Sequence, residues 1–419
     1  MIRQNFNADW TVEKGDGNSR MNSFLGNTQT KTVHLPYDAM IHESRTPDTK
    51  NGAQTGFYPG GEYIFQKHFT APQAWQGKPV SLVFEGVYQT ALVYLNGWLL
   101  TRNVNGYAEF TVEAGPYLKY GVDNLLKVIA DNSLEPNSRW YTGSGIYRPV
   151  RLLVGNKVYL PQDTVRITTR EADEGFALLD VTAQVQSAST VTERVTLQQT
   201  ICREGTAVLT DRQNLLLQPG ESRTVSFRYC VDSPALWSPE NPNLYASIMQ
   251  VLEGEEELDR EETSFGIRTL SIDAAHGVRI NGQTVKLRGA CIHHDNGILG
   301  AATLPDAEER RIRQLKEAGF NAIRSSHHPA GRALLDACDR YGVLVMDELS
   351  DVWNVRKNPY DYALYFEQDW KPTIQKMVAK DYNHPSVILY CVGNEISEAG
   401  SESGAETNRR LCNTFRELD

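Results

Sequence analysis

The chain has 419 residues, long enough for two to four domains of roughly 100 to 200 residues each. Hydrophobic residues make up 40% and charged residues 22% of it, as in a globular protein, and the net charge of −10 argues against nucleic acid or an anionic membrane as a partner. No apolar run approaches the roughly 20 residues of a membrane-spanning helix, and the first residues contain no apolar stretch of a secretory signal. We therefore expect a cytoplasmic protein.

The six cysteines form no C-x-x-C pair and no tight group with histidines, which argues against a zinc or redox motif. Cys202 and Cys230 lie on predicted strands of one small β-domain and could face each other. A reducing compartment argues against a disulfide between them.

Residues 1–160 are predicted to form an antiparallel β-sandwich of the jelly-roll type. Strand-like alternation recurs between closely spaced turn signals, most clearly at residues 61–69, 79–84, 91–95 and 124–130. Asn96-Gly97, between two apolar runs, indicates a hairpin turn. Exposed aromatic residues of this domain could bind a carbohydrate or pack on the next domain. At its end, the glycines and serine of residues 139–148 (RWYTGSGIYR) predict a projecting loop.

Residues 161–272 are predicted to form a second, immunoglobulin-like β-sandwich. Short alternating strands at residues 177–185, 195–201 and 222–229 fit about seven strands in about 110 residues. Near its end, the prolines of residues 236–242 (LWSPENP) predict a rigid extended segment with a structural role.

From residue 273 to 419, strands and helices alternate. Strands are predicted at residues 285–287, 321–324, 343–346 and 387–392. A helix at residues 307–318 follows the first strand, a second ends at Gly342, and two more carry Ile374 and Leu411 on their apolar faces. Four βα units in sequence correspond to the first half of a (β/α)8 TIM barrel.

If these strands are parallel, their C-terminal ends bring polar side chains to one face, where βα-barrels carry catalysis. These residues are His293, His327 with His328, residues 347–351, Asn394 and Glu395. One such residue alone is more often structural, but three strands that deliver histidine or acid to one rim indicate a site. Because Glu395 follows an apolar strand, we expect its pKa to be raised, which suits a general acid near neutral pH.

Two motifs resemble glycoside hydrolase family 2, the family of β-galactosidases and β-glucuronidases. One is D-x-N-H-P-S, an apolar strand and G-N-E at residues 381–395, with Tyr390 and Cys391 in place of the usual Trp and Gly or Ser. The other is N-x-x-R-x-x-H-Y-P through D-x-x-G at residues 321–346, with His328 in place of Tyr. With the order of domains, the resemblance covers essentially the whole chain.

The resemblance implies retaining hydrolysis of a β-glycoside, with a galactoside favoured over a glucuronide. It implies roles for seven residues: Glu395 as acid/base, Asn394 on the sugar 2-hydroxyl, His293 and His327 on other hydroxyls, Arg324 as the support of the nucleophile, and Asp351 and Trp353 along the sugar pocket. Magnesium-binding members place Glu and His where this chain has Val352 and Asn354, so no metal or other cofactor is expected. Several members carry Asp near the position of Arg139.

In the family the nucleophile is a Glu at the end of the seventh strand, whereas this sequence stops at Asp419, after the fourth unit. We therefore expect an N-terminal portion of a longer enzyme that is inactive alone, because one of two cooperating carboxyls is missing. Its open barrel edge should favour aggregation or pairing with another chain. Family members are often oligomers, so a homo-oligomer is possible. Two alternatives remain: a non-catalytic carbohydrate-binding or scaffold protein with a half-barrel, and complementation by a second polypeptide.

Overall fold

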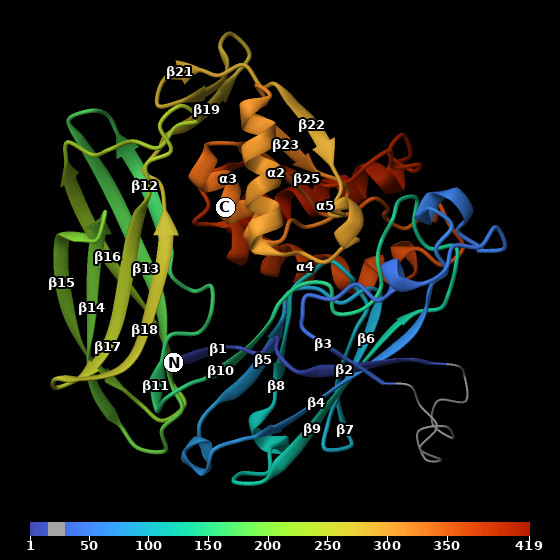
Figure 1. The fold of residues 1–419 in the computed structure, drawn as a ribbon. Helices are drawn as coiled ribbons and strands as arrows, with labels where there is room; N and C mark the ends of the chain where they lie inside the picture. The colour runs from blue at the N-terminus through green and yellow to red at the C-terminus, as the bar shows by residue number, and fades with distance from the viewer. Residues whose placement is uncertain (16–29) are drawn as a thin grey trace.

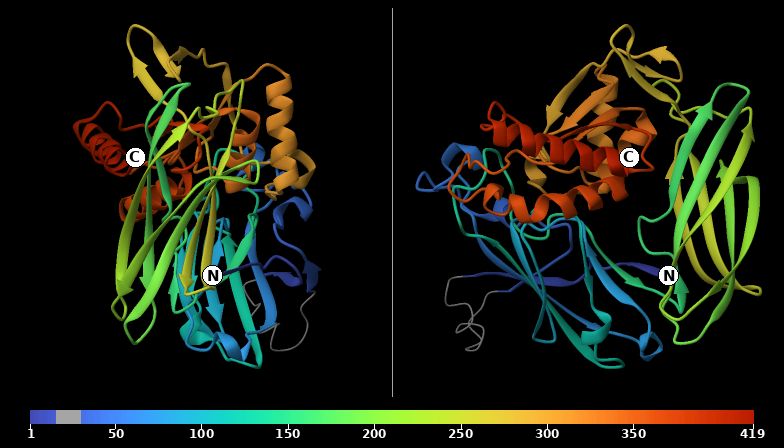
Figure 2. Two further views of the ribbon diagram at one scale, coloured as in Figure 1. Left: turned by 90° about the vertical axis from the view of Figure 1, so that its left-hand side faces the viewer. Right: turned by 180° about the vertical axis from the view of Figure 1, so that it is seen from behind.

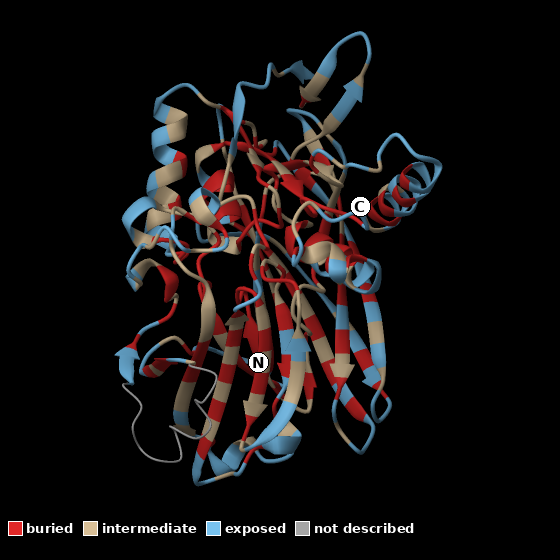
Figure 3. Ribbon diagram, turned by 90° about the vertical axis from the view of Figure 1, so that its right-hand side faces the viewer, coloured by how far each residue is buried: buried red, intermediate tan, exposed pale blue. Residues whose placement is uncertain are grey.

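Alternation of apolar and polar residues builds the first sandwich, and Figure 3 shows buried and more exposed positions alternating along its strands. In β9 (Asp123–Asn132), every second residue is buried. The computed structural model describes residues 1–15 and 30–419. One sheet has the order β1-β10-β5-β8, formed by Ile2–Asn5, Val150–Val154, Val80–Phe84 and Phe110–Glu113. The other has the order β3-β2-β4-β9-β6-β7, in which β9 is joined by Lys31–Val33, Trp10–Lys14, Gly61–Thr70, Thr90–Leu95 and Trp98–Asn103. Asn96 and Gly97 turn the β6–β7 hairpin with φ of 53° and 90°, which confirms the predicted turn.

A second antiparallel sandwich stands beside the first (Figures 1 and 2). Its first sheet contains β11 (Val158–Tyr159), β13 (Phe176–Ser187), β12 (Arg166–Ala172) and β16 (Ser222–Asp232). Its second has the order β15 (Thr206–Leu217), β14 (Glu193–Arg203), β17 (Tyr245–Glu253) and β18 (Glu256–Phe265). Cys202 and Cys230 lie in different sheets, and both are free thiols. The predicted domain limits remain predictions. β11 lies before the predicted limit at residue 160, but it pairs with β13 of the second sandwich.

The last third of the chain forms a half-barrel. A small sheet of β19 (Leu270–Asp273), β20 (Gly277–Ile280) and β21 (Gln283–Thr284) leads into it. Four parallel strands follow in sequence order: β22 (Gly289–Ile292), β23 (Ala322–Ser325), β24 (Leu344–Glu348) and β25 (Val387–Cys391). They alternate with α2 (Pro305–Glu317), α3 (Arg332–Tyr341), α4 (Phe366–Asp381) and α5 (Glu402–Leu418). None of the helices in the described parts of the chain is long and apolar enough to cross a membrane.

The first barrel strand lies later in the sequence than predicted. The strand expected at residues 285–287 is wrong, because the Val285 amide donates a hydrogen bond of 2.9 Å to the Val278 carbonyl and so extends the small sheet. Parallel pairing of Gly289 with Ala322 then sets the start of β22. The other three barrel strands lie within two residues of their predicted positions.

The L-W-S-P segment ties the second sandwich to the half-barrel. Trp237 is fully buried, and its indole Nε1 donates a hydrogen bond of 2.9 Å to the Asp339 carbonyl. Its ring packs in a cluster with Leu344 and Ile388 of the barrel sheet. At the same contact, Gly342 ends α3 with a φ of 65°, and a Cβ there would overlap the Pro239 backbone. These contacts support the structural role predicted for this segment.

Arg332 of α3 joins all three parts of the molecule. Its guanidinium donates to Glu109 of the first sandwich at 2.8 Å and 2.9 Å, and to Asp163, between β11 and β12, at 3.0 Å. Burial alone would raise the pKa of Glu109, but Arg332 and Arg151 outweigh it and lower the pKa to about 2. The neighbouring Glu85 has a raised pKa because burial dominates there.

The lowered pKa of Glu109 predicts acid-dependent stability. Its ionised form stabilises the fold fully above the ordinary value of 4.5, and this contribution disappears as the pH falls toward 2. We expect Glu109→Gln to reduce the free energy of unfolding at about pH 6 and to have a smaller effect at about pH 3, where part of the contribution is already lost. Denaturant titration of both proteins at each pH measures the difference, and a difference independent of pH would contradict the assignment.

The inner face of the barrel sheet forms an open groove of about 420 Å³, lined by residues of all four parallel strands. Within the described residues, β22 and β25 are the two edges of this sheet. The predicted tendency of these edges to pair with another chain stays a prediction.

Candidate active site

The polar strand ends meet at one end of the half-barrel, where the parallel strands finish (Figure 1). His293 follows β22, His327 lies two residues beyond β23, Glu348 ends β24, and Asn394 and Glu395 follow β25. The loop of residues 139–148 reaches this face from the first sandwich, because Arg139 contacts both Asp351 and Glu395. The structure thus brings the predicted strand ends and the predicted loop together.

Glu348 organises the inner side of the site. Its side chain is fully buried and receives two hydrogen bonds from Arg324, Nε to Oε2 at 2.9 Å and Nη2 to Oε1 at 2.8 Å. His327 Nδ1 lies 3.0 Å from Oε2. Arg324 Nη2 also donates to Asn394 Oδ1 at 3.3 Å. Arg324 therefore connects Glu348 to Asn394, and its predicted support of a nucleophile stays a prediction.

Asp351 organises the outer side. Its Oδ1 accepts hydrogen bonds from Arg139 Nη2 at 2.6 Å, Asn394 Nδ2 at 2.9 Å and Lys357 Nζ at 3.0 Å, and its Oδ2 accepts from Arg139 Nε at 3.1 Å. Burial alone would raise the pKa of Asp351, but these donors outweigh it and lower the pKa. Asp351 therefore fixes Asn394 and Arg139, and its predicted sugar contact stays a prediction.

Glu395 differs from its predicted environment. Its side chain is 69% exposed, and its Oε2 accepts a hydrogen bond of 2.9 Å from Arg139 Nη1. The hydrogen bond and charge of Arg139 lower the pKa of Glu395. The predicted raised pKa is therefore wrong for this arrangement, because an exposed carboxylate beside a guanidinium is stabilised in its ionised form. The backbone of Glu395 also takes a φ of 44°, which a non-glycine residue rarely adopts.

The histidines pack against aromatic residues of the first sandwich. His293 stacks on Trp140 with ring centroids 5.1 Å apart, and its Nδ1 is buried without a hydrogen-bond partner in the described structure. Burial and His327 lower the pKa of His293, so its neutral ring can accept or donate a hydrogen bond to a hydroxyl. His328 stacks on Tyr107 at 3.9 Å, and burial lowers its pKa well below the usual range. A cavity of about 50 Å³ lies between the first sandwich and the half-barrel, and Tyr107, Trp140 and His327 are among the residues that line it.

Trp353 lies beneath the turn that carries Asn394. It is 3% exposed, and its indole Nε1 donates a hydrogen bond of 2.8 Å to the Val392 carbonyl. Its ring packs with Leu349 and Phe366 in the core between α4 and α5. In this structure Trp353 supports the turn, and its predicted contact with a sugar stays a prediction.

Arg139 and Lys357 of the network were not predicted as site residues, and Glu348 was predicted only as part of a strand end. Glu348 falls within the predicted strand end at residues 347–351, so its position at the site could be predicted from the apolar strand that precedes it. Arg139 was noted only for its sequence position, and Lys357 follows no strand end. Only the fold brings Arg139 within reach of Glu395, 256 residues away in the sequence.

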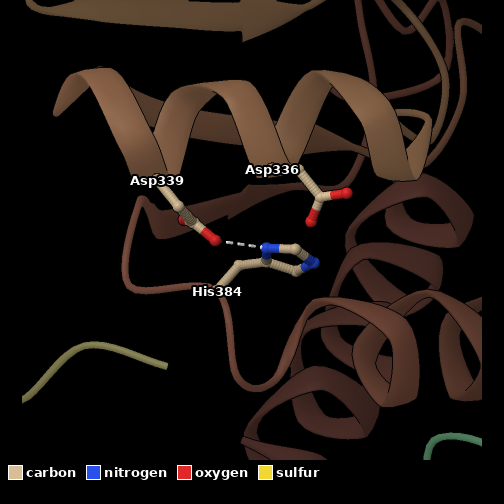
Figure 4. Close-up of side chains that lie close together, drawn as sticks. All are labelled: Asp336, Asp339 and His384. Carbon is tan, nitrogen blue, oxygen red and sulfur yellow. Dashed lines mark hydrogen bonds and ion pairs between the residues drawn. The ribbon is translucent and has the colours of Figure 1, made fainter. Parts of the chain in front are cut away.

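One group in the described part of the chain has side chains that could hold a metal ion: Asp336, Asp339 and His384 (Figure 4). His384 Nδ1 lies 2.6 Å from Asp339 Oδ2, whose partner oxygen accepts a hydrogen bond from the Ser386 amide at 3.1 Å. The group precedes β25, at the opposite end of the sheet from Glu395. Asp339 thus binds both His384 and Ser386, and the group is explained as a structural support for the N-H-P-S turn before β25.

Three family models match the chain, and together they cover almost all of it. The match to "Glycosyl hydrolase 2 galactose-binding domain-like" covers residues 10–176, the match to "Glycosyl hydrolases family 2" covers residues 158–268, and the match to "Glycosyl hydrolases family 2, TIM barrel domain" covers residues 274–419. Their order agrees with the two sandwiches and the half-barrel.

Individual relatives agree with these matches. β-Galactosidase BoGH2A of Bacteroides ovatus is 37% identical over 406 residues, which are 97% of this chain and 48% of that protein. A solved glycosyl hydrolase family 2 member from Bacteroides cellulosilyticus superposes on all of this chain with a TM-score of 0.96 at 36% identity, over 55% of its own length. Bacteroides uniformis β-glucuronidase superposes with a TM-score of 0.85 at 27% identity, over 51% of its length.

The chain thus spans about half the length of these relatives. Its three matched parts, their order and its predicted motifs all point to one family. The chain belongs to glycoside hydrolase family 2.

Proposed function

We propose that this chain contributes the acid/base residue of a retaining β-glycoside hydrolase that acts on β-galactosides. The observation that carries the proposal is the position of Asn394 and Glu395, which follow a parallel barrel strand and adjoin the network of Arg324 and Glu348. In retaining hydrolysis, one carboxyl attacks the anomeric carbon while another protonates the leaving oxygen and later activates water.

Glu395 takes the acid/base role in this proposal. It gives a proton to the glycosidic oxygen as the bond to the anomeric carbon breaks, and it later removes a proton from the attacking water. The Asn394 amide is oriented by Arg324 on its oxygen and by Asp351 on its nitrogen. A fixed amide is suited to bind the sugar 2-hydroxyl, a contact that strengthens in the transition state.

The second carboxyl is proposed to come from outside these 419 residues. Glu348 is the nearest candidate within the network, but it is fully buried and both its oxygens accept hydrogen bonds from Arg324 and His327. A carboxylate so occupied is a poor nucleophile. That the chain spans about half the length of its relatives supports an external source.

A β-glucuronide is the second candidate substrate, because one of the similar solved structures is a β-glucuronidase. The higher identity to a β-galactosidase favours the galactoside. A non-catalytic carbohydrate-binding role is the alternative outside catalysis, and it predicts sugar binding without turnover.

The test expresses the complete reading frame that contains these 419 residues and assays aryl β-galactoside and aryl β-glucuronide. We expect turnover of the galactoside, with kcat/KM at least about tenfold above that of the glucuronide. The reverse preference would replace the galactoside by the glucuronide. Sugar binding without turnover of either substrate would contradict the catalytic proposal.

A further inference from the structure

Arg139 stands between the acid/base residue and the rest of the site. It comes from the first sandwich, but its three hydrogen bonds described above go to barrel residues, two to Asp351 and one to Glu395. Its side chain is 32% exposed, so it borders the space open to a substrate. No other residue in the described structure donates a hydrogen bond to the Glu395 carboxylate.

The guanidinium is fixed before it meets Glu395. Asp351 binds it through two roughly parallel N–H bonds, a geometry specific to arginine. Lys357 Nζ in turn binds Asp351 Oδ1 at 3.0 Å and the Asn394 carbonyl at 2.6 Å. One of the remaining N–H groups, on Nη1, is therefore directed at Glu395, and the position of the guanidinium is set by Asp351 of the barrel.

The two halves of the proposed reaction place opposite demands on Glu395. Release of the leaving group needs the protonated acid, whereas activation of water needs the carboxylate. An ion pair with Arg139 favours the carboxylate and opposes the acid. The contact therefore favours the protonation state from which water activation starts and disfavours the state from which leaving-group protonation starts.

We propose that Arg139 is a positioning residue that holds Glu395 as a carboxylate in the sugar-free site and during water activation, and that releases it when a bound glycoside is protonated. This inference rests on the proposed function. When a glycoside binds, Glu395 takes up a proton from solvent. In the first step this proton passes to the glycosidic oxygen as the second carboxyl bonds to the anomeric carbon and the glycosidic bond breaks, and Arg139 Nη1 then binds the carboxylate that is left. In the second step the carboxylate takes a proton from water, whose oxygen bonds to the anomeric carbon as the bond between that carbon and the second carboxyl breaks.

The first test measures the ionisation of Glu395 directly in this 419-residue chain. Carboxyl ¹³C NMR follows the titration of glutamates labelled at Cδ, and Glu395→Gln identifies the resonance by its loss. We expect Glu395 to titrate at higher pH in Arg139→Met than in the unmodified chain, because the hydrogen bond and the positive charge are both removed. The other charges that face Glu395 are Lys357 and Asp351, and both remain.

Two further variants control this experiment. Arg139→Lys keeps the charge but cannot span both carboxylates, so its titration should lie between the two. Arg170→Met removes an exposed arginine that pairs with Asp180 in the second sandwich at 2.7 Å, and it should leave Glu395 unchanged. An unchanged titration in Arg139→Met, with the fold intact by thermal unfolding, would overturn the role of Arg139 and leave the proposed function standing.

The second test separates the two half-reactions in the complete reading frame. With an activated aryl galactoside, kcat/KM reports the first step, and kcat reports the second when water attack is slower. We expect Arg139→Met to lower kcat roughly tenfold and KM with it, and to move the alkaline limb of kcat/KM to higher pH. A uniform loss in kcat/KM with an unmoved pH profile would indicate a structural role alone and contradict the proposal.

Discussion

Arg332→Met is expected to lower the free energy of unfolding by roughly 3 kcal/mol. The substitution keeps much of the apolar volume but leaves Glu109 and Asp163 without the guanidinium that binds both. Removing one partner of a buried ion pair typically costs about 3 to 5 kcal/mol, and we expect the lower end because the arginine side chain is 20% exposed. Denaturant unfolding, followed by fluorescence of the tryptophans, measures the change.

Arg340→Met is the matched control in the same helix. Arg340 forms an ion pair of 3.1 Å with Glu309, and both side chains are well exposed, at 50% and 39%. An exposed pair of this kind contributes about 0 to 1 kcal/mol. Equal effects of the two substitutions would show that Arg332 is no more than a surface residue and would sink its role in joining the three parts.

Glu395→Gln is expected to lower kcat/KM for a β-galactoside with a poor leaving group by about 10² to 10⁴-fold in the complete reading frame. Gln has nearly the same shape but cannot give up or accept the proton. Because Arg139 can still donate to the amide oxygen, the fold of the site should survive. Steady-state kinetics and thermal unfolding of the same preparation distinguish lost chemistry from lost folding.

Glu402→Gln provides the control for this prediction. Glu402 lies exposed in the first turn of α5, seven residues from Glu395 in the sequence, and it takes no part in the network. Its kinetics should match those of the unmodified enzyme. Retention of activity in Glu395→Gln would mean that another residue serves as the acid/base, and the assignment would fail.

Much of the fold could be predicted because local patterns reflect its packing. Period-two alternation predicted the sandwich strands, and a helix with an apolar face that stops at Gly342 and an apolar strand that stops at Gly393 predicted barrel units, since each pattern follows from burial on one or both faces. The exception is the strand expected at residues 285–287. Its apolar residues looked like a barrel strand, but their backbone pairs with β20, and only the long-range register of β22 with β23 decides between the two.

The site could be predicted in part for the same reason. Parallel strands align their ends, so His327 and Asn394 could be placed together before the structure was known. The ionisation of Glu395 could not, because it depends on Arg139, a residue from another domain that no local pattern connects to the barrel. The role of Lys357 could not be predicted either, because it lies in an irregular segment after β24 and no local pattern indicates its contacts with Asp351 and Asn394.

The most direct test of the account is the product that Glu395→Ala forms from an activated aryl galactoside in the presence of azide. If Glu395 is the acid/base of a retaining enzyme, azide enters the space it vacates and attacks the covalent intermediate from that face. The account predicts a β-galactosyl azide, identified by the anomeric coupling in its NMR spectrum, and a rate that rises with azide concentration. An α-azide, or a rate and product unaffected by azide, would contradict it.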